Sequence, residues 1–94
     1  MEKVLLITPT YNEAENIQKF IDSTKKFKEL HLLVVDDNSP DGTATIVEKN
    51  MQINDSVKII KRSGKLGYGS AIIEGYKWGL ENNYYHFVQM DTDF

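Results

Sequence analysis

The chain has 94 residues, of which 40% are hydrophobic and 27% are charged. A chain of this length and composition forms one small domain with a modest core, and disorder is excluded. The formal net charge is −3 and Arg62 is the only arginine. A nucleic-acid-binding protein normally has a clustered basic surface, so we expect no nucleic-acid partner.

Cysteine is absent, which excludes disulfides, thiolate metal ligands and a thiol nucleophile. This composition fits a reducing compartment, and we expect a cytoplasmic location. The apolar run at residues 4–7 is too short for the core of a signal peptide. No run approaches the ~20 apolar residues of a membrane helix, so no transmembrane segment is predicted in this chain.

The first half of the chain predicts two strands and two helices. A strand at 4–7 precedes a helical pattern at 12–27, with Asn12 as N-cap and Glu15 completing a capping box. A strand at 30–35 follows. The second helix is expected to begin at 39–41, where proline occupies its first position, and to continue to Met51.

The second half continues the alternation. A strand at 57–60 precedes a helix at 69–82, and a strand at 85–90 follows. The helix carries Ala71, Gly75 and Gly79 at a spacing of four. Each glycine costs about 1 kcal/mol relative to alanine in a helix, so this pattern indicates close packing on the sheet. Uninterrupted apolar strands that alternate with helices predict an α/β fold: a Rossmann-like β-α-β-α-β-α-β parallel sheet.

Polar segments follow all four predicted strands, at 8–13, 36–43, 62–69 and 91–93. Open α/β sheets bind ligands outside the carboxyl ends of their strands, so we expect these segments to meet at one edge. Asp91 and Asp93 alternate at a strand end, so both carboxylates can face one cation. Oxygen ligands of this kind favour Mg²⁺ or Mn²⁺. The alternative is a pair of solvated turn acids.

The other candidate side chains each have a structural alternative. Asp36 and Asp37 are adjacent and point to opposite sides of their strand, so one can bind a ligand while the other caps a loop. Tyr11 could stack on a nucleobase or pack at a rim, and Glu13 could accept from a ribose or base or serve as a first-turn acid. Lys65, in a glycine-rich loop, could approach a phosphate or belong to a solvated basic turn.

Taken together, the four segments resemble the N-terminal half of a family 2 glycosyltransferase with the GT-A fold. The similarity is greatest to the dolichol-phosphate or polyprenol-phosphate mannose synthase branch. It rests on Thr-Pro-Thr-Tyr-Asn-Glu at 8–13, Val-Val-Asp-Asp-Asn-Ser-Pro-Asp-Gly-Thr at 34–43, Lys-Leu-Gly-Tyr-Gly-Ser-Ala at 65–71 and Gln-Met-Asp-Thr-Asp at 89–93. The family commonly has alanine where Thr92 stands, a difference that leaves both carboxylates in place.

This resemblance implies a metal-dependent transfer of mannose from GDP-mannose to dolichyl or polyprenyl phosphate, with inversion. It implies that Asp91 and Asp93 form the catalytic D-x-D pair that holds the metal on the diphosphate, and that Asp37 more than Asp36 binds the base. The nucleotide-binding residues it implies are Pro9, Tyr11, Glu13, Asp36, Asp37, Lys65 and Gly67. Two alternatives remain: a UDP-sugar-dependent polyprenyl-phosphate glycosyltransferase, and an inactive fragment that binds nucleotide or associates with itself.

The length bears on this interpretation, because a glycosyltransferase of this fold needs roughly 200 residues or more. We therefore expect residues 1–94 to form the nucleotide-sugar-binding half of a catalytic domain, inactive alone. The parent enzyme is expected at the cytoplasmic face of a membrane. An apolar sheet edge without further strands would favour self-association of the fragment.

Overall fold

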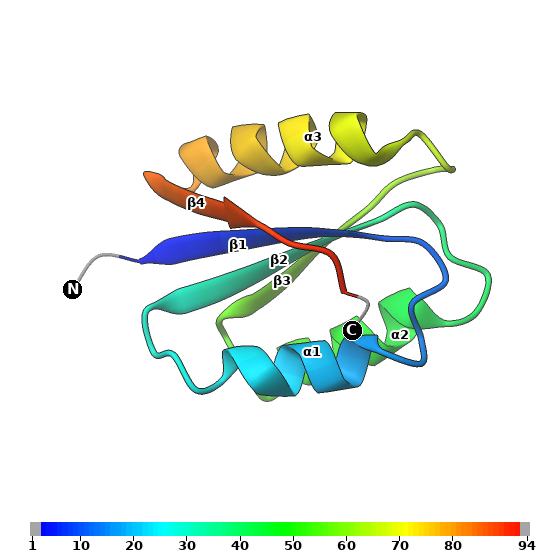
Figure 1. Ribbon diagram of the computed structural model, residues 1–94, viewed down its shortest axis with the longest axis horizontal. Helices are drawn as coiled ribbons and strands as arrows, with labels where there is room; N and C mark the ends of the chain where they lie inside the picture. The colour runs from blue at the N-terminus through cyan, green and yellow to red at the C-terminus, as the bar shows by residue number, and fades with distance from the viewer. Residues whose placement is uncertain (1–2, 93–94) are drawn as a thin grey trace.

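In the computed structural model, which describes residues 3–92, four strands form one sheet with helices on both faces (Figure 1). Strands and helices alternate along the chain, which confirms the predicted α/β class. The elements are β1 (Val4–Thr10), α1 (Ile17–Thr24), β2 (Leu30–Asp36), α2 (Thr43–Met51), β3 (Val57–Lys61), α3 (Tyr68–Glu81) and β4 (His86–Gln89).

The strand order is β3-β2-β1-β4, and every neighbouring pair is parallel. β1 and β2 therefore lie in the middle of the sheet and are covered on both faces. This position explains their uninterrupted apolar runs, because a central parallel strand has no face in water. All carboxyl ends of the strands lie at the same edge, which is where a ligand site is expected.

The pleat of the strands divides the core into two layers. Leu6, Leu32 and Val34 pack against α1 and α2 on one face of the sheet. On the other face, Leu5, Ile7, Leu33 and Val35 pack with Ala71 and Ile72 of α3. Figure 1 shows α3 alone on its side of the sheet and α1 and α2 together on the opposite side.

The small residues of α3 allow a close approach to β1. A Cβ atom built on Gly75 would lie 2.7 Å from Cγ2 of Ile7, which is fully buried. One on Gly79 would lie 2.8 Å from Cδ2 of Leu5. The predicted close packing of α3 on the sheet is thus confirmed.

The expected start of the first helix is wrong. α1 begins at Ile17, and its N-cap is Asn16. Asn12 has a φ of 58° and its backbone N–H donates to Oγ of Ser39 at 2.9 Å, so no capping box forms with Glu15. The helix also ends at Thr24 rather than at Phe27, where the chain turns towards β2.

The expected start of the second helix is also wrong. α2 begins at Thr43, after Gly42, whose φ of 90° is outside the helical region. The carboxylate of Asp41 accepts the backbone N–H of Thr43 at 3.1 Å, which favours a turn over a continuous helix. Among residues 3–92, no helix has the length and apolar character needed to cross a bilayer.

Candidate functional site

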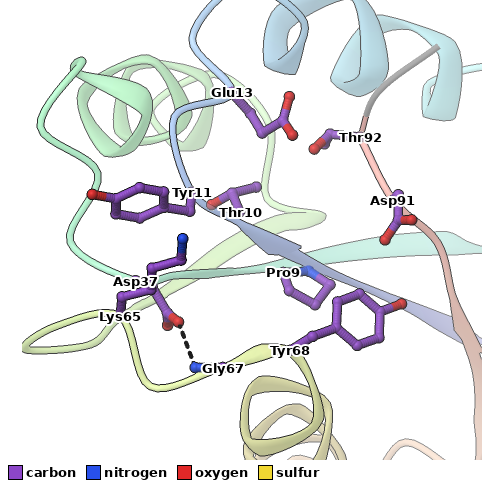
Figure 2. Close-up of a pocket in the computed structure, with 10 residues that line it drawn as sticks. All are labelled: Pro9, Thr10, Tyr11, Glu13, Asp37, Lys65, Gly67, Tyr68, Asp91 and Thr92. Atoms are coloured by element: carbon purple, nitrogen blue, oxygen red, sulfur yellow. Dashed lines mark hydrogen bonds between the residues drawn. The ribbon is translucent and has the colours of Figure 1, made fainter.

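A pocket of about 300 Å³ lies at the carboxyl edge of the sheet (Figure 2). Each of the four polar segments contributes to its wall, so the segments meet there as their positions after the strands predict. The lining residues are Pro9, Thr10, Tyr11, Glu13, Asp37, Lys65, Gly67, Tyr68, Asp91 and Thr92. Seven of the eight predicted site residues that lie within residues 3–92 are among them, and Asp36 is the exception.

Tyr11 and Lys65 form one wall of the pocket. Nζ of Lys65 lies 4.6 Å from the centroid of the Tyr11 ring, which is 39% exposed. A cation over an aromatic face is attracted by the negative potential of the ring. The two side chains together offer a flat aromatic surface and a positive charge to a ligand in the pocket.

Asp37 is a buried carboxylate that organises the loop after β3. Its Oδ2 accepts the backbone N–H groups of Leu66 at 3.0 Å and Gly67 at 3.3 Å. Nε of Arg62 donates to its Oδ1 at 2.6 Å, and Nη2 donates to its Oδ2 at 3.1 Å. Burial acts to raise the pKa of Asp37, but the hydrogen bonds from Arg62 and from the backbone N–H groups of Leu66 and Gly67, together with the charge of Arg62, outweigh it and hold the pKa below its usual value.

Arg62 connects this carboxylate to α3. Its side chain is only 3% exposed, and its guanidinium donates to the carbonyl oxygen of Gly67, to Oγ of Ser70 at 2.8 Å and to Oε1 of Glu74 at 3.4 Å. The composition alone gave Arg62 no role. Its position after β3, directly beside Asp37 after β2, is the signal in the sequence that could have identified the pair.

Asp36 lies on the other side of β2, away from the pocket lining. Its carboxylate accepts from Oγ1 of Thr10 at 2.6 Å and from the backbone N–H of Ser39 at 2.9 Å. The prediction that Asp36 and Asp37 point in opposite directions is confirmed. Asp36 holds a loop together rather than facing the pocket.

The loop between β2 and α2 holds the backbone segment that contains Tyr11 and Glu13 in place. Ser39 accepts the backbone N–H of Asn12, Thr43 accepts that of Glu13 at 3.0 Å, and Asp41 accepts that of Ala14 at 3.0 Å. The Ser-Pro-Asp-Gly-Thr run at 39–43 therefore has a structural function. Three of its side chains accept hydrogen bonds from the successive backbone N–H groups of residues 12–14, which lie before α1.

Asp91 is an exposed carboxylate two residues beyond the last residue of β4, and it lines the pocket opposite Tyr68. Partial burial, followed by the negative charge of Asp91 and a hydrogen bond with it, raises the pKa of Tyr68. Asp93, the other predicted metal ligand, lies outside the described residues. Within residues 3–92 no cluster of three or more histidine, cysteine or carboxylate side chains could hold a metal ion.

Thr92 is the pocket residue that sequence reasoning treated as neutral. Its side chain is 1% exposed, and its Oγ1 has no hydrogen-bond partner within the described part of the chain. Thr10, the last residue of β1, and Tyr68, the first residue of α3, also line the pocket and are not among the predicted site residues.

An open parallel sheet with a pocket at its carboxyl edge defines a class of α/β proteins that bind ligands at this position. The model for the glycosyl transferase family 2 matches residues 5–93, and the chain belongs to this family. This match confirms the family that the four motifs indicate.

Several named proteins are similar to this chain in sequence or in structure. Polyprenol monophosphomannose synthase of Mycolicibacterium smegmatis is 38% identical, over 98% of this chain and 36% of that protein. Undecaprenyl-phosphate mannosyltransferase of Micrococcus luteus is 41% identical, over 97% of this chain and 38% of that protein. The solved structure of the mannosyltransferase PcManGT from Pyrobaculum calidifontis, in complex with GDP-Man and Mn²⁺, has a TM-score of 0.72 and 26% identity. That match covers 81% of this chain and 24% of PcManGT, so this chain spans well under half the length of each of these relatives.

Proposed function

We propose that this chain forms the nucleotide-sugar-binding part of a glycosyltransferase that moves mannose from GDP-mannose to a polyprenyl phosphate, with inversion. The observation that carries the proposal is the pocket at the carboxyl edge, where an aromatic face, a lysine and three carboxylates converge. The names of the relatives, and the GDP-Man and Mn²⁺ bound to PcManGT, support the choice of donor, acceptor and metal.

The nucleoside is assigned to the wall formed by Tyr11, Glu13 and Asp37. The Tyr11 ring offers a face for stacking, and Pro9 and Gly67 border the same space. A carboxylate has about four acceptor sites, and Oδ1 of Asp37 receives only the Arg62 bond among the described contacts. Asp37 therefore keeps capacity to accept an N–H group of a base. Asp36 contributes to nucleotide binding indirectly, through Thr10 and Ser39.

The diphosphate is assigned to the wall that contains Lys65 and Asp91. Asp91 and Asp93 would hold Mg²⁺ or Mn²⁺, and the donor set fits because Mg²⁺ is commonly held by one or two carboxylates, with phosphates and water completing its shell. Such a site needs no cluster of three protein ligands. When bound, the cation supplies Lewis-acid stabilisation of the charge that develops on the departing diphosphate.

The residues of this chain bind and orient the donor in this reaction. An oxygen of the acceptor phosphate forms a bond to the anomeric carbon, and the bond from that carbon to the diphosphate oxygen breaks on the opposite face. Lys65 offers a positive charge to the diphosphate. The acceptor phosphate is already anionic at neutral pH, so the reaction requires no strong general base from Glu13 or Asp37.

Isothermal titration of the chain with GDP, with and without Mn²⁺, tests the proposal. We expect Mn²⁺ to strengthen binding and Asp91→Ala to abolish that increase. Asp55→Ala is the matched control, because Asp55 is an exposed carboxylate between α2 and β3, at the opposite edge of the sheet. Binding that is independent of Mn²⁺ and survives Asp91→Ala would remove the metal role. Tighter binding of UDP than of GDP would assign a UDP-sugar donor instead.

We further propose that the parent enzyme acts at the cytoplasmic face of a membrane and that the isolated chain associates with itself. The first part is supported by the lipid phosphates in the names of the relatives. The second is supported by β4, an edge strand that pairs with β1 alone among the described strands. The side chains of Val88 in β4 and of Met90 just after it are exposed. Sedimentation velocity that shows a monomer at all concentrations would contradict self-association.

A further inference from the structure

Thr92 has a buried hydroxyl group that the described part of the chain leaves without a partner. The side chain is 1% exposed, and its Oγ1 makes no hydrogen bond with the described residues. An unsatisfied buried polar group is unfavourable, and natural structures contain few of them. Because Thr92 also lines the pocket, a ligand that enters the pocket can supply the missing partner.

Asp91 and Thr92 follow β4, which ends at Gln89, and Thr92 lies in a bend of the chain. Their side chains face different parts of the pocket (Figure 2). Asp91 lies towards Tyr68 at the start of α3, whereas Oγ1 of Thr92 is turned towards the carboxylate of Glu13 (Figure 2). Glu13 accepts a long hydrogen bond of 3.4 Å from Nδ2 of Asn16 at Oε1, and its Oε2 makes no hydrogen bond with residues 3–92.

We infer that Thr92 Oγ1 and Glu13 together bind one hydroxyl group of the nucleotide ribose, and that Thr92 is a specificity-determining residue for ribonucleotides. A carboxylate accepts hydrogen bonds only, whereas a threonine hydroxyl both donates and accepts. A sugar hydroxyl matches this pair, because it can donate to Glu13 and accept from Thr92. A phosphate oxygen does not match it, because Glu13 would repel the negative charge.

This inference rests on the proposed nucleotide-binding function but not on the identity of the base. Ribose is common to GDP and UDP, so the assignment holds for either donor. It gives Thr92, the residue between Asp91 and Asp93, a role that the D-x-D pattern alone does not predict.

The test compares the dissociation constants of GDP and UDP, at saturating Mn²⁺, for the wild-type chain and two variants. Thr92→Val keeps the shape of the side chain and removes the hydroxyl, and we expect it to weaken binding about 3- to 10-fold, the effect of one neutral hydrogen bond. Thr92→Ser keeps the hydroxyl and should remain within about twofold of the wild type.

Thr8→Val is the matched control. Thr8 is fully buried in β1, its Oγ1 also has no partner within residues 3–92, and it does not line the pocket. We expect Thr8→Val to leave nucleotide affinity unchanged. Both valine variants should unfold at the same or a higher temperature than the nucleotide-free wild type, because each removes a buried hydroxyl without a partner.

Deoxynucleotides distinguish the ribose from other partners. Thr92 is inferred to bind one ribose hydroxyl group, the 2′ or the 3′. We expect the effect of Thr92→Val to disappear with the one deoxynucleotide, 2′-deoxy-GDP or 3′-deoxy-GDP, that lacks this hydroxyl, because the hydrogen bond is then already missing. If Thr92→Val binds GDP as tightly as the wild type does, or weakens GDP and both deoxynucleotides equally, the inference is overturned while the proposed function stands. If the wild-type chain binds neither GDP nor UDP, the inference and the proposed function are both overturned.

Discussion

Replacing Arg62 by methionine removes the cation that holds Asp37 and the loop after β3 in place. The guanidinium makes five hydrogen bonds, two of them to the Asp37 carboxylate. In the variant, Asp37 keeps, within residues 3–92, only the hydrogen bonds from the backbone N–H groups of Leu66 and Gly67. Methionine fills most of the space of the arginine stem, so the change is chiefly electrostatic.

The expected cost follows from the burial of the pair. The side chains of Arg62 and Asp37 are 3% and 8% exposed. Removing one partner of a buried ion pair typically costs about 3–5 kcal/mol, because the other charge remains buried without compensation. The stability of a chain of this size is only of the order of 10 kcal/mol, so Arg62→Met should lower the unfolding midpoint substantially.

Urea unfolding followed by the fluorescence of Trp78, the only tryptophan, measures this effect. Lys61→Met is the control, because Lys61 precedes Arg62 and forms an exposed ion pair with Glu48 at 2.9 Å. Exposed pairs contribute about 0–1 kcal/mol. A loss for Arg62→Met no larger than that for Lys61→Met would refute the reasoning. So would the absence of any recovery when Asp37→Asn is added, since that change removes the buried charge.

The pH dependence has a defined sign. In the wild type the pKa of Asp37 is lowered, so its contribution to stability is complete above the unfolded value of about 3.9 and is lost as the pH falls through the lower folded value. Removing Arg62 takes away a hydrogen bond and a charge that lower the pKa of Asp37, so this pKa is higher in the variant than in the wild type, and protonation relieves the unpaired charge there first. The stability difference between the wild type and Arg62→Met should therefore narrow as the pH falls through the pKa of Asp37 in the variant, and a difference that stays constant into the acid range would contradict this account.

Two further predictions concern the core and the loops. Gly75→Ala should destabilise the chain by about 1–3 kcal/mol, because the new Cβ would meet the stiff side chain of Ile7. Gly69→Ala is the control, because a Cβ there meets open space and the variant should be neutral or stabilised. Equal unfolding midpoints for the two variants would contradict this prediction. Asp41→Ala should accelerate amide exchange at Ala14 and cost about 0.5–2 kcal/mol, because Asp41 accepts the N–H of Ala14. Hydrogen exchange measured by NMR checks it, and unchanged protection of Ala14 would refute the proposed support of the pocket loop.

The strands and the edge that carries the pocket could be predicted because they depend on the apolar pattern of the chain. The starts of α1 and α2 could not, because they depend on long-range bonds between loops. Asn12 looks like an N-cap from its neighbours alone. In the structure its N–H donates to Ser39, which is 27 residues away. Local propensity has no information about such a partner.

The pocket residues that could be predicted were indicated by residue type and by their place after a strand. The residues that could not be predicted become important only through their position in the folded structure. Arg62 is one of several basic residues in its segment and becomes distinctive only when β2 and β3 pair in register and bring it beside Asp37. Thr92 separates two aspartates, and the sequence does not show that its hydroxyl is buried. The roles assigned to Pro9, Tyr11, Glu13 and Lys65 remain predictions.

The close approach of α3 to the sheet has a consequence for the pocket as well as for the core. Gly75 and Gly79 allow the helix to lie against Ile7 and Leu5. The same helix begins with Tyr68 on the pocket wall, opposite Asp91 at the end of β4. A helix moves as a nearly rigid body, so an added methyl group near its middle would displace its first turn and widen the gap to which the proposed function assigns the diphosphate. Affinity for the ligand and packing of the core are therefore coupled quantities in this fold, and a substitution at Gly75 that the chain tolerates should alter both.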